Sequence, residues 1–244
     1  MRESCRTMTC HSSDSPLPTP HSEIAEKAPS FSKPKCAKAP RPLPDFSREG
    51  ALLDGGARHV VGLDEVGRGP LAGPVVAAAV ILDPNAIPDG LDDSKRIKAH
   101  ERERLCNALF QTAIVAVAAV SADEIDRLNI RQASLLAMRR AFHGLSIIPT
   151  VALVDGRDIP DGLNCEALAI IGGDGLSVSI AAASIVAKVT RDRMMLRADQ
   201  LHPGYGFTAH MGYGTKAHLE AIRRLGPSPL HRMSFAPLKS MTAR

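Results

Sequence analysis

Aromatic side chains are scarce in this sequence: they make up 3% of its 244 residues, and tryptophan is missing altogether. A buried core must therefore be built mainly from Ala, Val, Ile and Leu. Long apolar runs are missing as well, because the stretches at 70–82 and 113–120 are too short and too rich in alanine to span a membrane. Residues 1–30 contain no continuous apolar segment like that of a secretory signal peptide. We therefore expect a soluble, cytoplasmic protein with no membrane contact.

The five cysteines, at positions 5, 10, 36, 106 and 165, show no pairing pattern. Cys106 and Cys165 lie in apolar surroundings, which indicates free thiols rather than a disulfide. The cysteines and histidines near the N-terminus do not have the spacing of a zinc finger. A reducing compartment fits this usage best.

Composition divides the chain into three parts. Residues 1–57 are rich in Ser, Pro, Lys and His and have no apolar period, so we expect a disordered extension whose removal leaves activity unchanged. Residues 58–238 are expected to form one catalytic domain, and residues 239–244 a short C-terminal tail. The formal net charge of +4 permits a polyanionic partner without requiring one.

From Arg58 onward, strand-like and helix-like segments alternate, which is typical of the α/β class. Ser121-Ala-Asp-Glu124 resembles a capping box that opens a short helix. Because the first three strands follow one another closely, we expect them to form an antiparallel meander within a mixed sheet. The expected strands are 59–63, 75–82, 112–121, 150–154 and 168–171, and the expected longer helices are 99–111, 131–143, 179–195 and 215–225.

The most informative segment is Gly62-Leu-Asp-Glu-Val-Gly-Arg-Gly-Pro-Leu-Ala-Gly-Pro74. The apolar run before it predicts a short buried strand that leads straight into Asp64 and Glu65. Successive strand side chains point to opposite faces, so both acids can face solvent only if the strand ends there. A carboxylate in an apolar sheet is costly unless it is paired or binds a cation. The two acids therefore indicate either a structural ion pair or the start of a metal site.

The glycines of this segment allow backbone conformations with positive φ and close approach of another molecule. Their N–H groups and the guanidinium of Arg68 suit a phosphate or a sugar. Carboxylates for a cation beside donors for a phosphate suggest metal-dependent phosphodiester chemistry. A dinucleotide-binding turn is the alternative, but the glycine spacing is wrong and two prolines would interrupt the helix that should follow.

Two further acids follow predicted strands, Asp155 in Asp155-Gly156 and Asp174 in Asp174-Gly175. Taken singly, each is an ordinary turn signal. If the strands are neighbours and parallel, however, these acids converge with Asp64 and Glu65 at one edge of the sheet, where ligands of α/β proteins bind. Their mutual repulsion would raise their pKa values, and a divalent cation would remove that penalty. A ligand set made only of oxygen favours Mg²⁺ or Mn²⁺ over zinc.

The chain resembles ribonuclease HII from about residue 60 to residue 237. The resemblance implies an RNase H-like fold, with a mixed five-stranded central sheet flanked by helices and a C-terminal helical extension. It places the metal-binding acids of the family on Asp64, Glu65, Asp155 and Asp174. The segments that carry the likeness, in the order of the family, are the glycine-rich segment, Asp93-Ser-Lys95, Val154-Asp-Gly156, Ala181-Ala-Ala-Ser-Ile-Val-Ala-Lys-Val-Thr-Arg-Asp192, His202-Pro-Gly-Tyr-Gly206, His210-Met-Gly-Tyr-Gly-Thr-Lys216 and His231-Arg-Met-Ser-Phe235.

Members of that family hydrolyse the phosphodiester on the 5′ side of a ribonucleotide embedded in duplex DNA, and they cut the RNA of RNA/DNA hybrids. The resemblance implies the same nucleic-acid substrates here and two Mg²⁺ or Mn²⁺ ions per site. One ion, held mainly by Asp64 and Asp174, would activate water; the other, near Asp64, Glu65 and Asp155, would stabilise the leaving 3′-oxygen. The products would carry 3′-hydroxyl and 5′-phosphate ends. We expect a monomer.

The resemblance also implies how the substrate is read. Gly67-Arg68-Gly69 would sense the ribose 2′-OH, the group that separates RNA from DNA. Arg68 could equally form a salt bridge to a neighbouring acid. Tyr213 would stack on the deoxyribose that follows the ribonucleotide, whereas Tyr205 is expected to be structural. The candidate phosphate contacts are Lys95, Lys188, Arg191, His210, Lys216 and Arg232, and Ser184 and Lys188, one helical turn apart, are preferred among the polar residues.

Two other functions are open. A non-catalytic nucleic-acid-binding module would lack an acid or the intact glycine turn, and both are present. The sister family, ribonuclease HIII, typically has an extra N-terminal domain and a lysine in the glycine turn. Here the extension is too poor in apolar residues for such a domain, and Arg68 fits the HII pattern.

Overall fold

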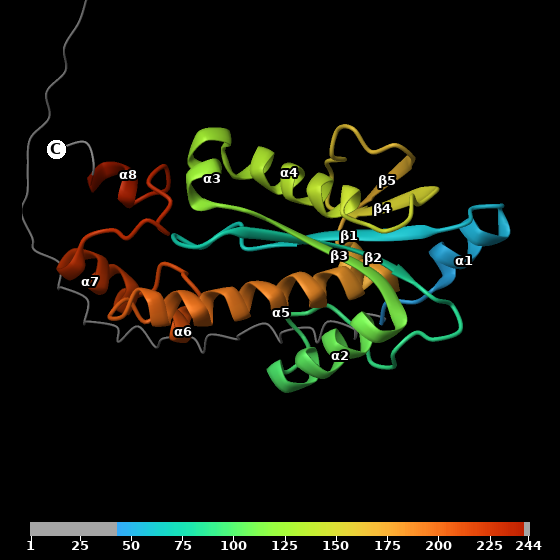
Figure 1. Ribbon diagram of the computed structural model, residues 1–244, viewed down its shortest axis with the longest axis horizontal. Coiled ribbons are helices and arrows are strands. Elements are labelled where there is room, and N and C mark those ends of the chain that lie inside the picture. The colour runs from blue at the N-terminus through green and yellow to red at the C-terminus, as the bar shows by residue number, and fades with distance from the viewer. Residues whose placement is uncertain (1–42, 242–244) are drawn as a thin grey trace, which may run out of the picture. The chain divides into compact units, whose positions relative to one another are not determined.

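A computed structural model describes residues 43–241, and its centre is a five-stranded sheet with the strand order β3-β2-β1-β4-β5 (Figure 1). β1, β2 and β3 pair antiparallel, while β4 and β5 run parallel to β1. The predicted meander and the mixed sheet are therefore confirmed. The strands are β1 (Val60–Val66), β2 (Val75–Leu82), β3 (Ala113–Val120), β4 (Val151–Asp155) and β5 (Glu166–Ile170).

Helices cover both faces of the sheet. In Figure 1, α3 and α4 lie on one side, and α2 and the long helix α5 lie on the other. Every residue of β2 is buried, because its alternate side chains pack against α4 and against α5 with α2. The helices are α1 (Ser47–Asp54), α2 (Ala99–Thr112), α3 (Ala122–Leu128), α4 (Ile130–His143), α5 (Val178–Leu201), α6 (Phe207–His210), α7 (Lys216–Leu225) and α8 (Leu238–Met241), with a 3₁₀ turn, η1, at Gly173–Gly175.

Small residues let α5 lie close to the sheet. Ala181, Ala182 and Ala183 are fully buried, and a Cβ on Gly62 of β1 would stand 2.2 Å from the backbone of Ser179. Any larger residue at position 62 would therefore push α5 away from β1. This contact matters for function, because α5 carries two of the predicted substrate-binding residues.

Local signals in the sequence correspond to local structure. Ser121 caps α3 in the expected capping box, since its side chain accepts from the Glu124 N–H while the Glu124 carboxylate accepts from the Ser121 N–H. Cys106 and Cys165 are free thiols, the first buried and the second half-buried. Within the described range, no helix is both long and apolar enough to cross a bilayer.

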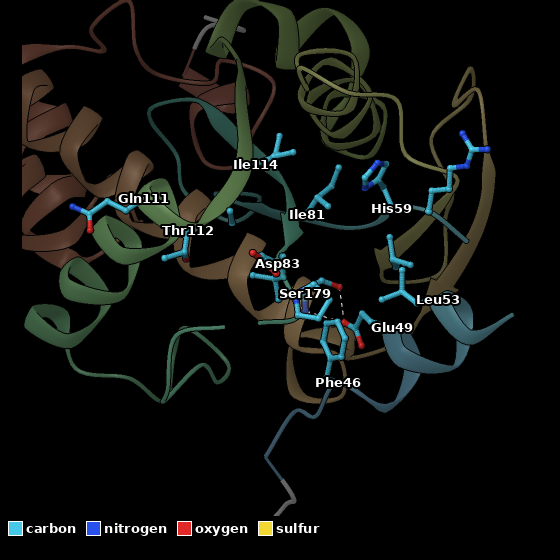
Figure 2. Close-up of a pocket in the computed structure, with 15 residues that line it drawn as sticks. Phe46, Glu49, Leu53, His59, Ile81, Asp83, Gln111, Thr112, Ile114 and Ser179 are labelled. Atoms are coloured by element: carbon cyan, nitrogen blue, oxygen red, sulfur yellow. Dashed lines mark hydrogen bonds between the residues drawn. The ribbon is translucent and has the colours of Figure 1, made fainter. Parts of the chain in front are cut away.

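The predicted disordered extension is wrong for its last part. Residues 1–42 lie outside the described residues, but Ser47–Asp54 form the helix α1. The buried Glu49 of this helix contacts Ser177 just before α5 and Ser179 in its first turn, and Figure 2 shows the second contact. Beside this contact is a cavity of about 520 Å³. At the other end, α8 crosses the boundary that composition placed at residue 238, and its Leu238 is fully buried.

Candidate active site

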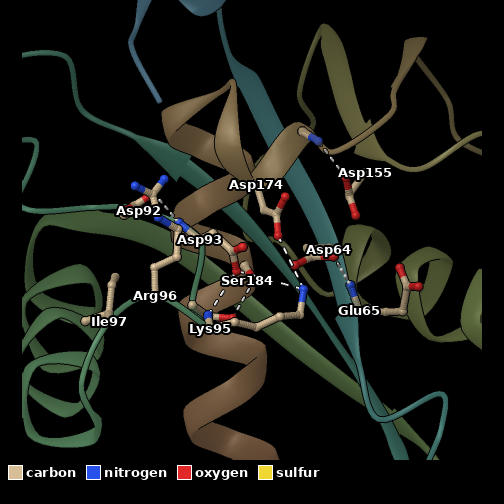
Figure 3. Close-up of polar contacts among 12 residues, drawn as sticks. Asp64, Glu65, Asp92, Asp93, Lys95, Arg96, Ile97, Asp155, Asp174 and Ser184 are labelled. Atoms are coloured by element: carbon tan, nitrogen blue, oxygen red, sulfur yellow. Dashed lines mark hydrogen bonds and ion pairs between the residues drawn. The ribbon is translucent and has the colours of Figure 1, made fainter. Parts of the chain in front are cut away.

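The four predicted metal-binding acids line one pocket of about 390 Å³ (Figure 3). β1 and β4 are in parallel register as far as the pair Leu63 and Val154, so the next step along both strands places Asp64 beside Asp155. Asp174 arrives from η1, directly after β5. Acids from three separate segments thus meet at the carboxyl ends of the parallel strands.

β1 is longer than expected, and this opens the pocket. The prediction that the strand ends before Asp64 is wrong, because pairing with β2 continues as far as Val66 and Val76. Pairing with β4 stops three residues earlier on β1, at Leu63. Asp64 and Glu65 therefore remain in a strand but project where the parallel half of the sheet has already ended. Asp64 is only 5% exposed.

Burial, with the charges of neighbouring acids, raises the pKa values of Asp64, Glu65 and Asp174. Burial, and then the charges of Glu65 and Asp155, raise the pKa of Asp64 well above its usual range. Burial also raises the pKa of Glu65, although the nearby Arg68 guanidinium opposes this shift. The pKa of Asp174 is raised by burial and then by Asp93 and Asp155. The pocket therefore holds more negative charge than its own cations balance.

Few positively charged side chains lie close to these carboxylates. Arg68 Nη1 lies 3.0 Å from Glu65 Oε1, which is the salt bridge that the sequence left open as an alternative. Lys95 Nζ lies 3.6 Å from Asp174 Oδ2, with 79% of the lysine side chain exposed. Asp155 Oδ1 accepts from the Gly173 N–H at 2.7 Å, which fixes the carboxylate without neutralising it.

The donor set fits a hard divalent cation that keeps part of its water shell. All four groups are carboxylates, and oxygen ligands suit Mg²⁺ and Mn²⁺. In the described part of the chain, however, no group of three His, Cys, Asp or Glu residues could hold a metal ion by itself. Mg²⁺ is commonly held by one or two carboxylates, with water and substrate phosphate oxygens as the remaining ligands. The pocket fits an ion of that kind.

The same pocket contains the residues that the sequence preferred for substrate binding, although not all of the candidate phosphate contacts. The glycine turn, residues 67–74, lines the pocket with Gly67, Arg68 and Gly69, and Gly67 has φ 101°. The Tyr213 side chain lies beside it, because a Cβ on Gly69 would stand 3.5 Å from Tyr213 Cε1. Tyr213 is 47% exposed. The selected residues that line the pocket are Asp64, Glu65, Gly67, Arg68, Gly69, Lys95, Asp155, Asp174, Ser184, Lys188 and Tyr213.

Three of the candidate phosphate contacts are wrong. Arg191 and Arg232 are fully buried and donate to backbone carbonyl groups. His210 is 9% exposed, and its ring nitrogens bond the Tyr205 carbonyl and the Gly212 N–H. None of the three can reach a phosphate from these positions.

The structure also shows the surroundings of two other residues that the sequence analysis named, Lys216 and Tyr205. Lys216 is exposed but does not line the pocket, and its Nζ lies 4.0 Å from Glu220. Tyr205 is structural, as expected: its hydroxyl donates to the Gly226 carbonyl at 2.8 Å, and its ring stacks on Phe207.

Sequence reasoning missed residues that support the pocket. Ser94 Oγ lies 2.9 Å from Ser184 Oγ, and Lys188 Nζ lies 2.7 Å from Asp192 Oδ1. Ser94 lies in the segment Asp93-Ser-Lys95, in which Lys95 carries the charge that indicates a phosphate contact. A neutral, buried hydroxyl carries no comparable signal.

A row of buried histidines behind Tyr213 was also missed. His218 Nδ1 donates to the Tyr213 carbonyl at 2.9 Å, and the Nε2–H of His231 donates to His218 Nε2 at 3.1 Å. The remaining nitrogen of His231 accepts from the Ser228 N–H at 2.9 Å. The ring of His210 stacks on His218 at 4.2 Å. Both linked imidazoles are therefore neutral in this arrangement.

This arrangement predicts that acid weakens the fold. Burial, and then the charges of His218, His202 and His210, lower the pKa of His231 to about 4. In the unfolded chain the same imidazole has a pKa near 6.5. The unfolded state therefore binds the proton first as the pH falls, and the stability contributed by His231 is lost between about pH 6.5 and pH 4.

Urea unfolding of the wild type and of His231→Gln at pH 7, 5.5 and 4.5 measures this effect. The wild type should lose more stability over the range than the variant. The buried carboxylates contribute equally to both proteins, so they cancel in the comparison. Identical pH dependence in the two proteins would contradict the prediction.

Comparison with known proteins finds similar proteins over most of the chain. The family model described as Ribonuclease HII matches residues 61–238. A protein named Ribonuclease HII from Brucella ovis is 59% identical over 198 residues, which is 80% of this chain and 90% of the relative. One of the same name from Sinorhizobium medicae is 58% identical over 200 residues, which is 82% of this chain and 93% of the relative. The solved structure of ribonuclease H2 from Pyrococcus horikoshii OT3 is similar with a TM-score of 0.66 and 27% identity, over 76% of this chain and 98% of that one.

Proposed function

The chain belongs to the ribonuclease HII family, and we propose that its pocket hydrolyses the phosphodiester 5′ of a ribonucleotide embedded in duplex DNA. It is a metal-dependent endoribonuclease, with the RNase H-like fold that the resemblance implied. Its substrate is nucleic acid, including the RNA of RNA/DNA hybrids. The products carry 3′-hydroxyl and 5′-phosphate ends.

One observation carries this proposal: the acids, the glycine turn and Tyr213 share a single pocket. A pocket with the acids alone would serve many phosphodiester reactions. The glycine turn adds backbone donors small enough to approach a sugar hydroxyl, and the 2′-OH is the group that distinguishes RNA from DNA. Tyr213 adds an exposed ring on the same side. The two elements together favour a substrate in which a ribose is followed by a deoxyribose.

The acids and Lys95 have different roles in the proposed reaction. Asp64 and Asp174 would hold one divalent ion, and Asp64, Glu65 and Asp155 a second; when bound, the ions would supply activation of water and stabilisation of the leaving 3′-oxygen. Asp64 belongs to both sets because it lies at the centre of the pocket. The exposed ammonium of Lys95, beside Asp174, is placed to meet a substrate phosphate.

The α5 side of the pocket positions the strand. Ser184 and Lys188 are one turn apart and both line the pocket. Lys188 is held by Asp192, so its ammonium is oriented before the substrate arrives. Across the pocket, Glu65 orients Arg68, whose side chain is 54% exposed and free to contact a phosphate or a sugar on its open side.

A cleavage assay tests the proposed function. A labelled DNA duplex with one ribonucleotide is incubated with Mg²⁺ or Mn²⁺, beside an all-DNA duplex and a reaction with EDTA. We expect a single cut on the 5′ side of the ribonucleotide, no cut in the all-DNA duplex, and no cut with EDTA. A ribonucleotide-containing duplex that stays whole with either ion would overturn the proposal.

Replacing Tyr213 with Ala should reduce cleavage at a single ribonucleotide more than cleavage of a uniform RNA/DNA hybrid. Stacking on an aromatic side chain contributes about 1–3 kcal/mol, which corresponds to a loss of roughly 5- to 150-fold. The backbone of Tyr213 is held independently by His218, so the loop should remain in place. The measured quantity is kcat/KM on the two substrates.

Two controls accompany this measurement. Tyr213→Phe keeps the ring and should retain the preference for the junction. Tyr205→Phe removes the hydrogen bond to Gly226 and should change stability but not preference. Equal losses on both substrates for Tyr213→Ala would refute the stacking role.

A further inference from the structure

Two arginines lie fully buried behind the glycine turn without a carboxylate partner. Arg191 and Arg232 are both 0% exposed, and within residues 43–241 neither forms a salt bridge. Burial, and then the charge of Arg191, lower the pKa of Arg232 to about 9, so it stays protonated at neutral pH. A buried, unpaired charge is costly unless its donors find acceptors. The position of these acceptors shows what the two side chains hold.

Arg232 donates three hydrogen bonds to the glycine turn. Nε bonds the Gly73 carbonyl at 3.0 Å, Nη1 the Arg68 carbonyl at 3.0 Å, and Nη2 the Gly67 carbonyl at 2.6 Å. The planar guanidinium thus bonds both ends of the turn, Gly67 and Gly73, from its buried side.

These bonds also set the direction of the N–H groups of the turn. In a trans peptide the C=O and the following N–H point in opposite directions. Because the carbonyl groups of Gly67 and Arg68 point inward to Arg232, the N–H groups of Arg68 and Gly69 point away from it, toward the pocket that the turn lines. In the described structure, neither of these N–H groups has a hydrogen-bond partner. Two adjacent free donors therefore face the place where the substrate binds.

Arg191 joins this turn to the loop that carries Tyr213. Its guanidinium bonds the Ala72 and Pro74 carbonyls at 3.1 and 3.0 Å, and the Met211 carbonyl at 3.0 Å. The two segments touch directly as well, because the Leu71 N–H donates to the Gly212 carbonyl at 2.8 Å. The side chain packs tightly there: a Cβ on Gly67 would stand 2.3 Å from Arg191 Nε.

We propose that Arg232 and Arg191 are positioning residues for recognition of the ribonucleotide. Arg232 orients the free N–H groups of Arg68 and Gly69, and Arg191 sets the separation between this turn and Tyr213. This inference rests on the proposed function. Asp64 and Glu65 are held separately, because β1 pairs with β2 and packs against α5, so the arginines act on binding geometry rather than on these two acids.

The first test is Arg232→Lys, which keeps the charge but replaces the planar fork with a single ammonium that cannot hold all three carbonyl groups. We expect kcat/KM for the single-ribonucleotide duplex to fall by about 10- to 100-fold, mainly through a higher KM. Arg127→Lys, at an exposed arginine of α3, is the matched control and should leave KM unchanged. Thermal melting of each variant shows whether it is folded.

The two possible failures are distinguishable. If the wild type leaves the ribonucleotide-containing duplex whole, the proposed function fails. If the wild type cuts and folded Arg232→Lys retains the wild-type KM, only the positioning role fails. A loss in kcat alone, equal on junction and hybrid substrates, would likewise overturn it.

A second measurement covers the case in which Arg232→Lys does not fold. Amide NMR of the wild type should show the N–H groups of Arg68 and Gly69 exchanging rapidly with solvent when free. They should become protected on binding a single-ribonucleotide duplex with Ca²⁺ in place of Mg²⁺, and less so with an all-DNA duplex. Amides that are already protected in the free protein, or that respond equally to both duplexes, would refute the outward orientation.

Discussion

Replacing Asp64 with Asn should reduce cleavage of a single-ribonucleotide duplex by a factor on the order of a thousand or more, equivalent to about 4 kcal/mol in the barrier. Asn has the same shape but no charge, and Asp64 lies at the centre of the pocket between Glu65, Asp155 and Asp174. In the proposed mechanism it contributes to both ions. Losing it should therefore remove the chemistry while leaving the glycine turn and Tyr213 free to bind the duplex.

The same substitution should not weaken the metal-free fold. Because the pKa of Asp64 is raised in the folded state, its charged form opposes folding, and this penalty decreases as the pH falls through the raised pKa and is gone below the pKa of the unfolded chain. Asn is neutral at every pH, so the variant should melt at the same temperature as the wild type or higher when EDTA is present. An active site that is less stable than its neutral variant is expected where charge is concentrated for function.

The control for Asp64→Asn is Asp123→Asn, at an acid whose side chain is 78% exposed and paired with Arg127 on α3. It should change neither activity nor melting temperature appreciably. Turnover of Asp64→Asn near the wild-type rate would reject the metal role. A variant that no longer binds the duplex would show that Asp64 acts on binding instead.

Most of the site could be predicted because its signals are local in the sequence. Asp64, Asp155 and Asp174 each follow an apolar run, and parallel strands bring such positions to one edge. The order of the strands and helices could be predicted equally well, since β2 and α2 differ from their predicted ranges by one residue at most. Strand and helix periods depend only on neighbouring residues.

The predictions that were wrong concern features that depend on contacts between segments distant in the sequence. Arg191 and Arg232 look like surface cations in the sequence, and only the fold shows that they hold backbone carbonyl groups more than a hundred residues away. The extra length of β1 depends on β2, which continues to pair beyond the end of β4. Helix α1 was missed because its one buried residue is an acid, Glu49, and its apolar contact with the domain is limited to the half-buried Leu52 and Leu53.

Replacing Glu49 with Ala should lower the free energy of unfolding by about 2 kcal/mol, because the buried Oε2 has no hydrogen-bond partner and offsets part of what Oε1 contributes. Its Oε1 accepts from the Ser177 hydroxyl at 2.6 Å and from the Ser179 N–H and hydroxyl at 2.9 and 2.6 Å. Hydrogen bonds to a charged acceptor contribute about 1.5–3 kcal/mol each, and the three share one oxygen. The carboxylate also sits at the N-terminus of α5, where the helix dipole favours negative charge. Urea unfolding at neutral pH measures the change.

Further variants test whether the hydrogen bonds of Glu49 cause the loss of stability. Glu49→Gln keeps an acceptor oxygen and should have intermediate stability, whereas Asp54→Ala, at the exposed end of the same helix, should be close to the wild type. A chain that starts after residue 57 lacks Glu49, so it should be at least as unstable as Glu49→Ala, contrary to the expectation from composition. Since α5 carries Ser184, Lys188 and Arg191, loosening its first turn should also lower activity at elevated temperature before global unfolding. A Glu49→Ala protein as stable as Asp54→Ala would mean that α1 contributes nothing to holding α5 in place.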